Sequence, residues 1–197
     1  NTVNLTGPFK WNTTLNISSY NDRWKERNPD VVLAPYEKED APIRAIYGCV
    51  SDGILQIGET PPASMPDLLP GQMKVKDLNG FDPNDGSKLL GHPDGKIDAA
   101  DRIYLGSTDP KVIIGFGNMF EYKNFDLNIF FYGMFGQYVA NSNRAKYGPS
   151  GCEYILQRQN YSKEVLERWT PDNPTNKFPS GFYSAYYGGD DWLLEKV

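Results

Sequence analysis

The sequence predicts an all-β fold of antiparallel strands, with long irregular loops between them and one or two short helices. The chain has 197 residues, and its 19 glycines and 15 prolines favour many turns over long helices. Apolar and polar side chains alternate with a period of two in several stretches. No apolar run approaches the roughly 20 residues of a transmembrane helix, so any membrane crossing would use strands.

The first predicted strand covers residues 9–20, where apolar and polar side chains alternate. Residues 21–43 are charged and contain prolines, which predicts a long loop. A shorter extended segment is expected over residues 44–57. Residues 59–71 contain four prolines, and we expect them to be irregular.

The strongest pattern predicts two strands within residues 112–136, joined by a turn at Lys123 and Asn124, because asparagine tolerates the left-handed backbone that such a turn needs. In the register that this turn sets, Tyr122 faces Phe125. One face of the hairpin is then almost entirely apolar, whereas the other mixes polar, small and aromatic groups. Each strand has about the 9 to 11 residues that cross a bilayer when tilted.

Two folds explain this hairpin equally well from periodicity alone. In a transmembrane β-barrel, the apolar face would meet lipid, and Phe120, Tyr122 and Phe125 beside the turn would lie at the membrane interface. In a soluble β-sandwich, the same face would pack against a second sheet. The hairpin therefore leaves both alternatives open.

The C-terminal part predicts one short helix at residues 162–169, capped by Ser162, with Val165, Leu166 and Trp169 on one side. Residues 169–180 read as a loop fixed by prolines, and the last residues read as part of a strand. Tyr183, Tyr186 and Tyr187 are expected to pack against their neighbours rather than bind sugar. These three tyrosines are the last aromatic cluster of the chain before Trp192.

The net charge of −5 and the pI near 4.9 argue against a nucleic-acid partner, which would demand a basic surface. The sequence has no nucleophile elbow, phosphate loop or zinc motif, so we expect no enzyme activity. His92 is expected to be a solvated side chain. Cys49 and Cys152 are expected to be separate thiols, and one disulfide between them is the alternative.

An acidic stretch, DLNGFDPNDGSKLLGHPDGKIDAADR at residues 77–102, begins and ends like a calcium loop. Its first part supplies Asp77 and Asn79, and its last part supplies an Asp-Gly turn followed by further aspartates. The predicted ligands of a calcium ion are Asp77, Asn79, Asp94, Lys96 through its carbonyl, Asp98 and Asp101. The alternative is an ordinary pair of surface turns.

Several motifs in one order carry a family resemblance: KVKDLNG, DGKIDAADRIYLGS, YKNFDLNIFFYGMFG, RWTPDNPTNKFP and DWLLEKV. From about Tyr47 onward, the chain resembles the C-terminal barrel region of SusC/RagA-like TonB-dependent outer-membrane transporters. The resemblance implies that residues 1–197 are a fragment of the β-barrel domain, without the plug domain and the final strands. It also implies that residues 81–93 are a loop insertion, because joining Gly80 to Asp94 restores the family's uninterrupted acidic turn.

The resemblance further implies a function in the outer membrane, in contact with its lipid. The parent protein would import glycans or peptides together with TonB and a SusD-like surface lipoprotein. The rival hypothesis is a self-contained extracellular carbohydrate-binding module, a β-sandwich stabilised by calcium.

Overall fold

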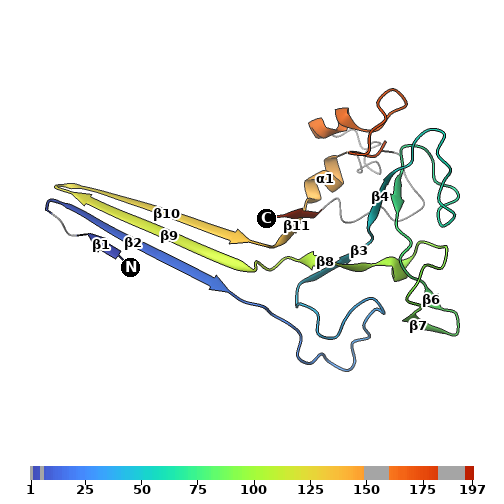
Figure 1. Cartoon of the computed structure of the whole chain (residues 1–197), viewed down its shortest axis with the longest axis horizontal. Helices are drawn as coiled ribbons and strands as arrows, with labels where there is room; N and C mark the ends of the chain where they lie inside the picture. Colours follow the sequence, from blue (N-terminus) through green and yellow to red (C-terminus); the bar gives the residue numbers. More distant parts are fainter. Residues whose placement is uncertain (1, 5–6, 149–159, 182–193) are drawn as a thin grey trace.

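The computed structural model describes residues 2–4, 7–148, 160–181 and 194–197, which form a long arm and a rounded head (Figure 1). The arm is one four-stranded antiparallel sheet in the order β1-β2-β9-β10. Its strands are β1 (Thr2–Asn4), β2 (Phe9–Ser19), β9 (Val112–Tyr122) and β10 (Phe125–Phe135). The predicted strand at residues 9–20 and the predicted hairpin are confirmed.

The hairpin register agrees with the sequence prediction along its whole length. Tyr122 lies opposite Phe125, and the pairing continues to Val112 opposite Phe135. The turn differs in one detail, because the residue with left-handed backbone is Lys123, at φ +54°, and not Asn124. A lysine in this conformation carries a modest steric cost, which the 11 pairs of the two strands outweigh.

Strand β2 extends this sheet on the other side of β9. Phe9 pairs with Tyr122 and Ser19 with Val112, so residues far apart in the sequence lie side by side. Odd-numbered residues of β2 therefore share a face with even-numbered residues of β9. Most apolar residues of the three long strands consequently fall on one face of the arm, whereas Ile113, Met119, Phe130, Tyr132 and Met134 lie on the other.

The head is built from short strand pairs, short helices and loops. Its strands are β3 (Ala45–Gly48), β4 (Ser51–Ile54), β5 (Met73–Val75), β6 (Phe81–Asp82), β7 (Asp85–Leu89), β8 (Ile103–Ser107), β11 (Tyr138–Ala140) and β12 (Leu194–Lys196). They pair as β3-β8, β4-β5, β6-β7 and β11-β12. The helices are the 3-10 helix η1 (Ala99–Asp101), α1 (Ser142–Tyr147) and the 3-10 helix η3 (Lys163–Glu167).

A small apolar core holds the head together. Its buried members are Cys49, Leu55, Met65, Leu68 and Val75, with Ile97 packed against them. The proline-rich residues 59–71 form turns rather than strands, as predicted, and contribute two of these side chains. The predicted loop at residues 21–43 likewise contains no helix or strand.

The C-terminal segment docks onto this core. Trp169 is buried, and its indole Nε1 donates a hydrogen bond to Gln56 Oε1 at 2.9 Å. The predicted helix is present as η3, with Ser162 as its N-cap. The prediction for Leu166 is wrong, because its side chain is 80% exposed. The helix ends at Glu167, so its period does not set the direction of Trp169.

Some predictions fall outside the described residues. These are the environment of Cys152 and the packing of Tyr183, Tyr186 and Tyr187. Cys49 lies in the core of the head, completely buried. Among the described helices, none combines the length and the apolar character needed to cross a membrane.

Candidate functional site

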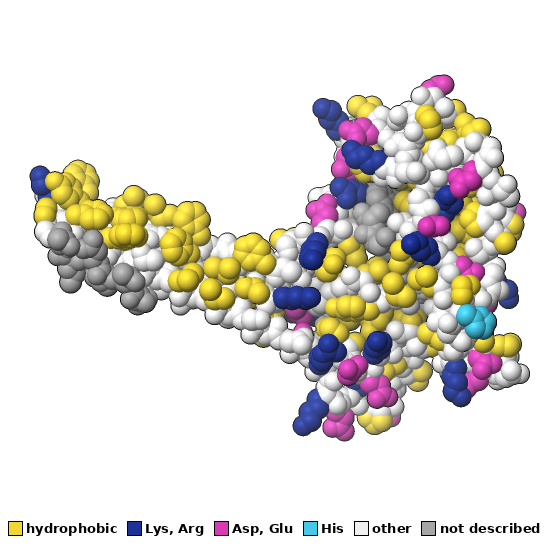
Figure 2. Space-filling view, viewed as in Figure 1, with side chains coloured by type: hydrophobic (Ala, Val, Ile, Leu, Met, Phe, Trp, Pro, Cys, Tyr) yellow, Lys and Arg dark blue, Asp and Glu magenta, His cyan; other side chains and the backbone are white. Residues whose placement is uncertain are grey.

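The apolar face of the arm is the most distinctive surface of the molecule. Side chains on this face stay exposed, among them Phe125 at 79%, Phe131 at 60% and Leu127 at 56%. Figure 2 shows hydrophobic side chains along the arm, whereas most charged side chains lie on the head. An apolar surface of this extent marks contact with lipid or with another apolar surface.

Aromatic rings gather on this face near the turn of the hairpin. The ring centroids of Phe9 and Phe120 are 6.2 Å apart, and those of Trp11 and Phe120 are 5.8 Å apart. The ammonium of Lys123 lies 5.2 Å from the ring centroid of Tyr122. Aromatic rings beside cations at the end of a strand suit the boundary between lipid and water.

One polar cluster interrupts the apolar face. Asn118 is 8% exposed, and its Oδ1 accepts hydrogen bonds from Trp11 Nε1 at 3.0 Å and from Thr13 Oγ1 at 2.8 Å. These bonds pair the Asn118 oxygen with the Trp11 and Thr13 donors, which limits the cost of placing these polar groups among apolar side chains. They also link the two strands where Thr13 of β2 pairs with Asn118 of β9.

The opposite face of the arm is mixed in character. Lys10 and Glu121 form an ion pair at 3.2 Å near the turn. Farther along, Gly115 and Gly117 of β9 lie under the ring of Phe130, since a Cβ at either glycine would come within 3.5 Å of that ring. That distance is an ordinary van der Waals contact, so the ring of Phe130 lies against the sheet over these two positions.

The acidic loop brings together the two halves of the calcium-like sequence. The carboxylate of Asp77 accepts hydrogen bonds from the backbone N–H of Asp94 at 3.3 Å and of Gly95 at 2.8 Å. Asp94 Oδ1 in turn accepts from the backbone N–H of Lys96 at 2.9 Å. The residues on either side of the 81–93 segment thus meet in space, although 17 positions separate Asp77 from Asp94.

Asp101 organises the inner side of this loop. It is completely buried, and its carboxylate accepts from the backbone N–H groups of Leu78, Asn79 and Asp98 at 2.7, 3.2 and 2.8 Å. Asp98 caps η1 by accepting from Ala100 N–H at 2.7 Å. Three amide donors compensate the buried carboxylate for its lost water.

The segment between the two halves is a hairpin made of β6 and β7. Its ends are joined by a hydrogen bond from Leu90 N–H to Gly80 O at 2.8 Å. Asn79 Oδ1 accepts from Gly91 N–H at 2.7 Å. A Cβ at Gly80 would lie 2.4 Å from Asp94 Cβ, so only glycine allows the two halves to approach this closely.

The loop fits a metal only in part. Asp77 and Asp94 lie together, whereas the carboxylate of Asp101 is already engaged by three amides. Among the described residues, no group of three or more His, Cys, Asp or Glu side chains is arranged to hold a metal ion. Calcium binding by the six predicted ligands therefore stays a prediction.

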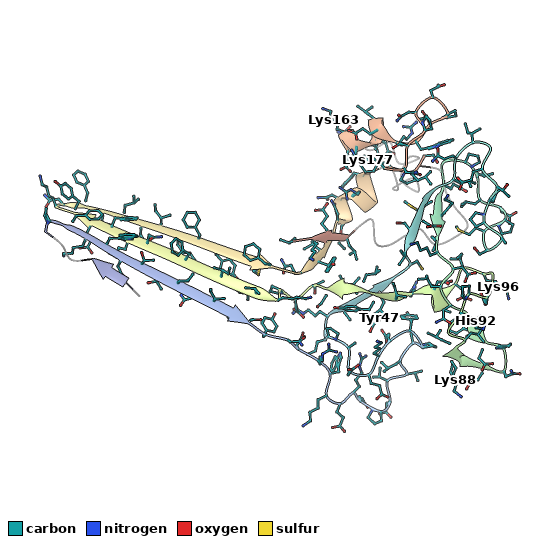
Figure 3. The ribbon with its side chains drawn as sticks, viewed as in Figure 1. Tyr47, Lys88, His92, Lys96, Lys163 and Lys177 are labelled. Atoms are coloured by element: carbon teal, nitrogen blue, oxygen red, sulfur yellow. The ribbon has the colours of Figure 1, made fainter. Side chains whose placement is uncertain are left out.

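His92 and Lys96 lie at the same end of the head, close to the hairpin that carries Lys88 (Figure 3). His92 is exposed, as expected, and its Nδ1 lies 3.0 Å from Pro93 O. Lys96 is exposed as well.

Sequence reasoning missed a hollow between α1 and η3. Its volume is about 520 Å³. The lining residues are Asn141, Asn143, Arg144, Tyr147, Asn160, Tyr161, Ser162 and Glu164. In the sequence, the lining asparagines and tyrosines lie on both sides of residues 149–159. Their spacing follows no motif, so the sequence does not indicate that they line one hollow. The structure shows this by placing α1 beside η3.

These features define the class first: an antiparallel all-β chain whose longest sheet exposes a largely apolar face. Sequence comparison then finds relatives in Formosa agariphila. The chain is 31% identical to the TonB-dependent receptor P26 over 189 residues and 27% identical to the TonB-dependent receptor P3 over 197 residues. Each match covers 91% of this chain but only 18% of the relative, so the chain spans about a fifth of their length. No family model matches.

Comparison with solved structures gives the same fold. The RagAB peptide transporter superposes with a TM-score of 0.64 at 18% identity, over 98% of this chain and 20% of that chain. The RagAB peptide importer in its closed-closed state gives a TM-score of 0.63 at 17% identity. The two Formosa relatives confirm the resemblance to TonB-dependent receptors, and the RagAB structures share the fold. These receptors and transporters are consistent with the expectation of no enzyme activity. The described strands form open sheets, so the antiparallel all-β class is shown and the barrel is not.

Proposed function

We propose that the arm is part of the wall of an outer-membrane β-barrel in a TonB-dependent transporter. Strands β2, β9 and β10 would cross the membrane side by side, with the face of Phe116, Leu127 and Phe131 against lipid. The observation that carries this proposal is the exposed apolar face, which runs the full length of three paired 11-residue strands. Strands of 9 to 11 residues match the thickness of a bilayer.

The two ends of the arm support an orientation. At one end, β9 and β10 are joined by a two-residue turn at Lys123 and Asn124. At the other end lies the head, which contains the long segment between β2 and β9 (Figure 1). Barrels of the outer membrane have short periplasmic turns and long extracellular loops, so the head would face the outside of the cell.

The rival sandwich module needs a second sheet over the apolar face. The side chains of Phe125, Leu127 and Phe131 are instead more than half exposed. The head packs at one end of the arm rather than on its apolar face (Figure 1). This arrangement favours the barrel wall over the sandwich.

The parent protein would import glycans or peptides, take its energy through TonB and work with a SusD-like surface lipoprotein. Support for these parts of the proposal comes from the named relatives, which are TonB-dependent receptors, and from the RagAB structures, which are described as a peptide transporter and importer. The chain itself would contribute barrel wall and extracellular loops.

Spin labels on neighbouring residues of β10 test the barrel wall. In the full-length parent protein, with Cys49 and Cys152 changed to alanine, Leu127→Cys and Asn128→Cys each receive a nitroxide. After reconstitution into vesicles, we expect the label at 127 to be relaxed mainly by oxygen, which dissolves in lipid. The label at 128 should respond mainly to a water-soluble nickel chelate. Equal responses at the two positions would contradict the proposal.

A further inference from the structure

Asn79 and Gly80 form the one asparagine-glycine pair of the sequence. A backbone nitrogen can attack the side-chain carboxamide of the asparagine before it, and the attack is least hindered when the attacking residue has no side chain. Asparagine is accordingly one of the thermolabile residue types. Whether the reaction proceeds in a folded chain depends on how the two groups are held.

The structure holds the two reacting groups next to each other. The Gly80 N–H donates a hydrogen bond to Asn79 Oδ1 at 3.0 Å, so the Gly80 nitrogen lies beside the carboxamide that it would attack. The Asn79 N–H donates to Asp101 Oδ1 at 3.2 Å, which fixes the backbone on the other side of the carboxamide. Holding two groups close together removes much of the entropic cost of their reaction.

A second backbone donor points at the same carboxamide oxygen. The Gly91 N–H donates to Asn79 Oδ1 at 2.7 Å, and the hydrogen bond from Leu90 N–H to Gly80 O brings Gly91 to this place. Negative charge develops on the oxygen when a nitrogen attacks a carboxamide, and an N–H already aimed at that oxygen stabilises the charge. Gly91 is exposed and precedes His92, which lies at the outer edge of the head (Figure 3), so water reaches this side of the loop.

We propose that Asn79 is a site of spontaneous deamidation. The Gly80 nitrogen attacks Asn79 Cγ and forms a C–N bond, the bond from Cγ to Nδ2 breaks, and Nδ2 leaves as ammonia with the proton of the Gly80 N–H. Water then opens the resulting five-membered imide at one of its two carbonyl carbons. Opening at one carbon gives aspartate, and opening at the other gives isoaspartate, in which the main chain runs through the side-chain carbons.

Deamidation changes both the charge and the geometry of the acidic loop. Either product adds a negative charge to a stretch that already holds Asp77, Asp94 and Asp101. Because like charges repel, the loop becomes less stable unless a cation is bound. Isoaspartate also lengthens the main chain next to Gly80, where a Cβ would lie 2.4 Å from Asp94 Cβ and little space is left. The inference concerns this loop alone and does not depend on the proposed function.

Peptide mapping of the full-length parent protein by mass spectrometry tests the site. The protein is kept folded in detergent at mildly alkaline pH with a calcium chelator, so that no bound ion holds the carboxamide. Trypsin cleaves after Lys76 and Lys88, so one peptide contains both Asn79 and Asn84, and its fragment ions report each position. We expect Asn79 to convert about 10-fold faster or more than Asn84, because the side chain of Asp85 hinders attack at Asn84. Equal rates would overturn the proposal.

A comparison with the unfolded protein separates the effect of the structure from that of the sequence. In concentrated urea the asparagine-glycine pair is still present, but the hydrogen bonds from Gly80 and Gly91 to the Asn79 oxygen are lost. We therefore expect Asn79 to convert faster in the folded protein than in urea. Equal or slower conversion in the folded protein would overturn the proposal.

Deletion of residues 81–93 removes the Gly91 donor and keeps the Asn79-Gly80 pair. Conversion of Asn79 in this variant should slow about 10-fold, since one donor to the developing negative charge is lost. His92→Ala is the matched control, because it changes an exposed side chain of the same segment and leaves the Gly91 N–H in place. It should keep the rate of the parent protein. An unchanged rate after the deletion, or a slower rate after His92→Ala, would overturn the role given to Gly91.

Discussion

Gly71 shows how tightly the C-terminal segment packs on the rest of the head. Its backbone has φ +89°, and a Cβ there would lie 2.4 Å from Trp169 Cε3 and 2.7 Å from Ser180 Cβ. Gly71→Ala should therefore combine backbone strain with overlap and lower the free energy of unfolding by about 2 to 4 kcal/mol. Hydrogen exchange of residues 165–181 in the parent protein, measured by mass spectrometry, should show the lost protection.

Gly91→Ala provides the matched control. Gly91 also has positive φ, at +82°, but open space surrounds its missing Cβ. This variant should cost only about 1 kcal/mol, from backbone strain alone. Equal effects of the two substitutions would mean that the contact with Trp169 contributes nothing.

Single residues were the hardest to predict from the sequence. Asn124 was expected to take the left-handed conformation, yet Lys123 takes it, because the pairing of the two strands sets the turn more strongly than the preference of either residue. Placing Leu166 on the same side as Trp169 assumes a regular helix that includes Trp169. The helix ends two residues before Trp169, so that assumption fails.

The acidic loop is a single unit whose two halves meet through hydrogen bonds from the Asp94 and Gly95 N–H groups to the Asp77 carboxylate. We expect Ca²⁺ to bind where Asp77 and Asp94 approach, at oxygen distances of about 2.3 to 2.6 Å. Calorimetric titration of calcium into the parent protein should give heat, and Asp94→Ala should abolish it. The hydrogen bond between Asp94 Oδ1 and Lys96 N–H is lost in the same variant, so hydrogen exchange of residues 94–101 should be measured alongside.

Deletion of residues 81–93 is the informative control for this loop. The hydrogen bonds from the Asp94 and Gly95 N–H groups to the Asp77 carboxylate lie outside the deleted residues, so the shortened loop should keep its geometry. Calcium affinity should be preserved or increased. An absence of heat from both the parent protein and the deletion variant would identify the stretch as hydrogen-bonded surface turns.

The strands of the arm were predictable from the sequence. Their period of two shows which side chains share a face, and the two-residue turn sets the register of β9 with β10. The pairing of Phe116 with Phe131 follows from the sequence alone and is present in the structure. The hollow was not predictable, since it depends on Arg144 meeting Glu164 across 20 residues. No local pattern specifies that contact.

At the scale of the whole molecule, the apolar face of the arm should make the isolated chain soluble only in the presence of detergent. The isolated 197-residue chain carries an apolar sheet face with no cover, so we expect it to aggregate in detergent-free buffer. Size-exclusion chromatography with and without a mild detergent measures this difference. A monodisperse chain without detergent that also unfolds cooperatively on heating would instead support the sandwich module.

Pairing of β3 with β8 has a consequence for the order in which the chain assembles. Strands β2 and β9 must align although roughly 90 residues lie between them, and the entropic cost of closing such a loop grows as the logarithm of its length. Ala45 pairs with Ser107, which removes most of that segment from the loop. Roughly 30 flexible residues then remain, and the closure cost falls by about 1 kcal/mol. Early formation of the head would thereby speed the alignment of β2 with the β9-β10 hairpin.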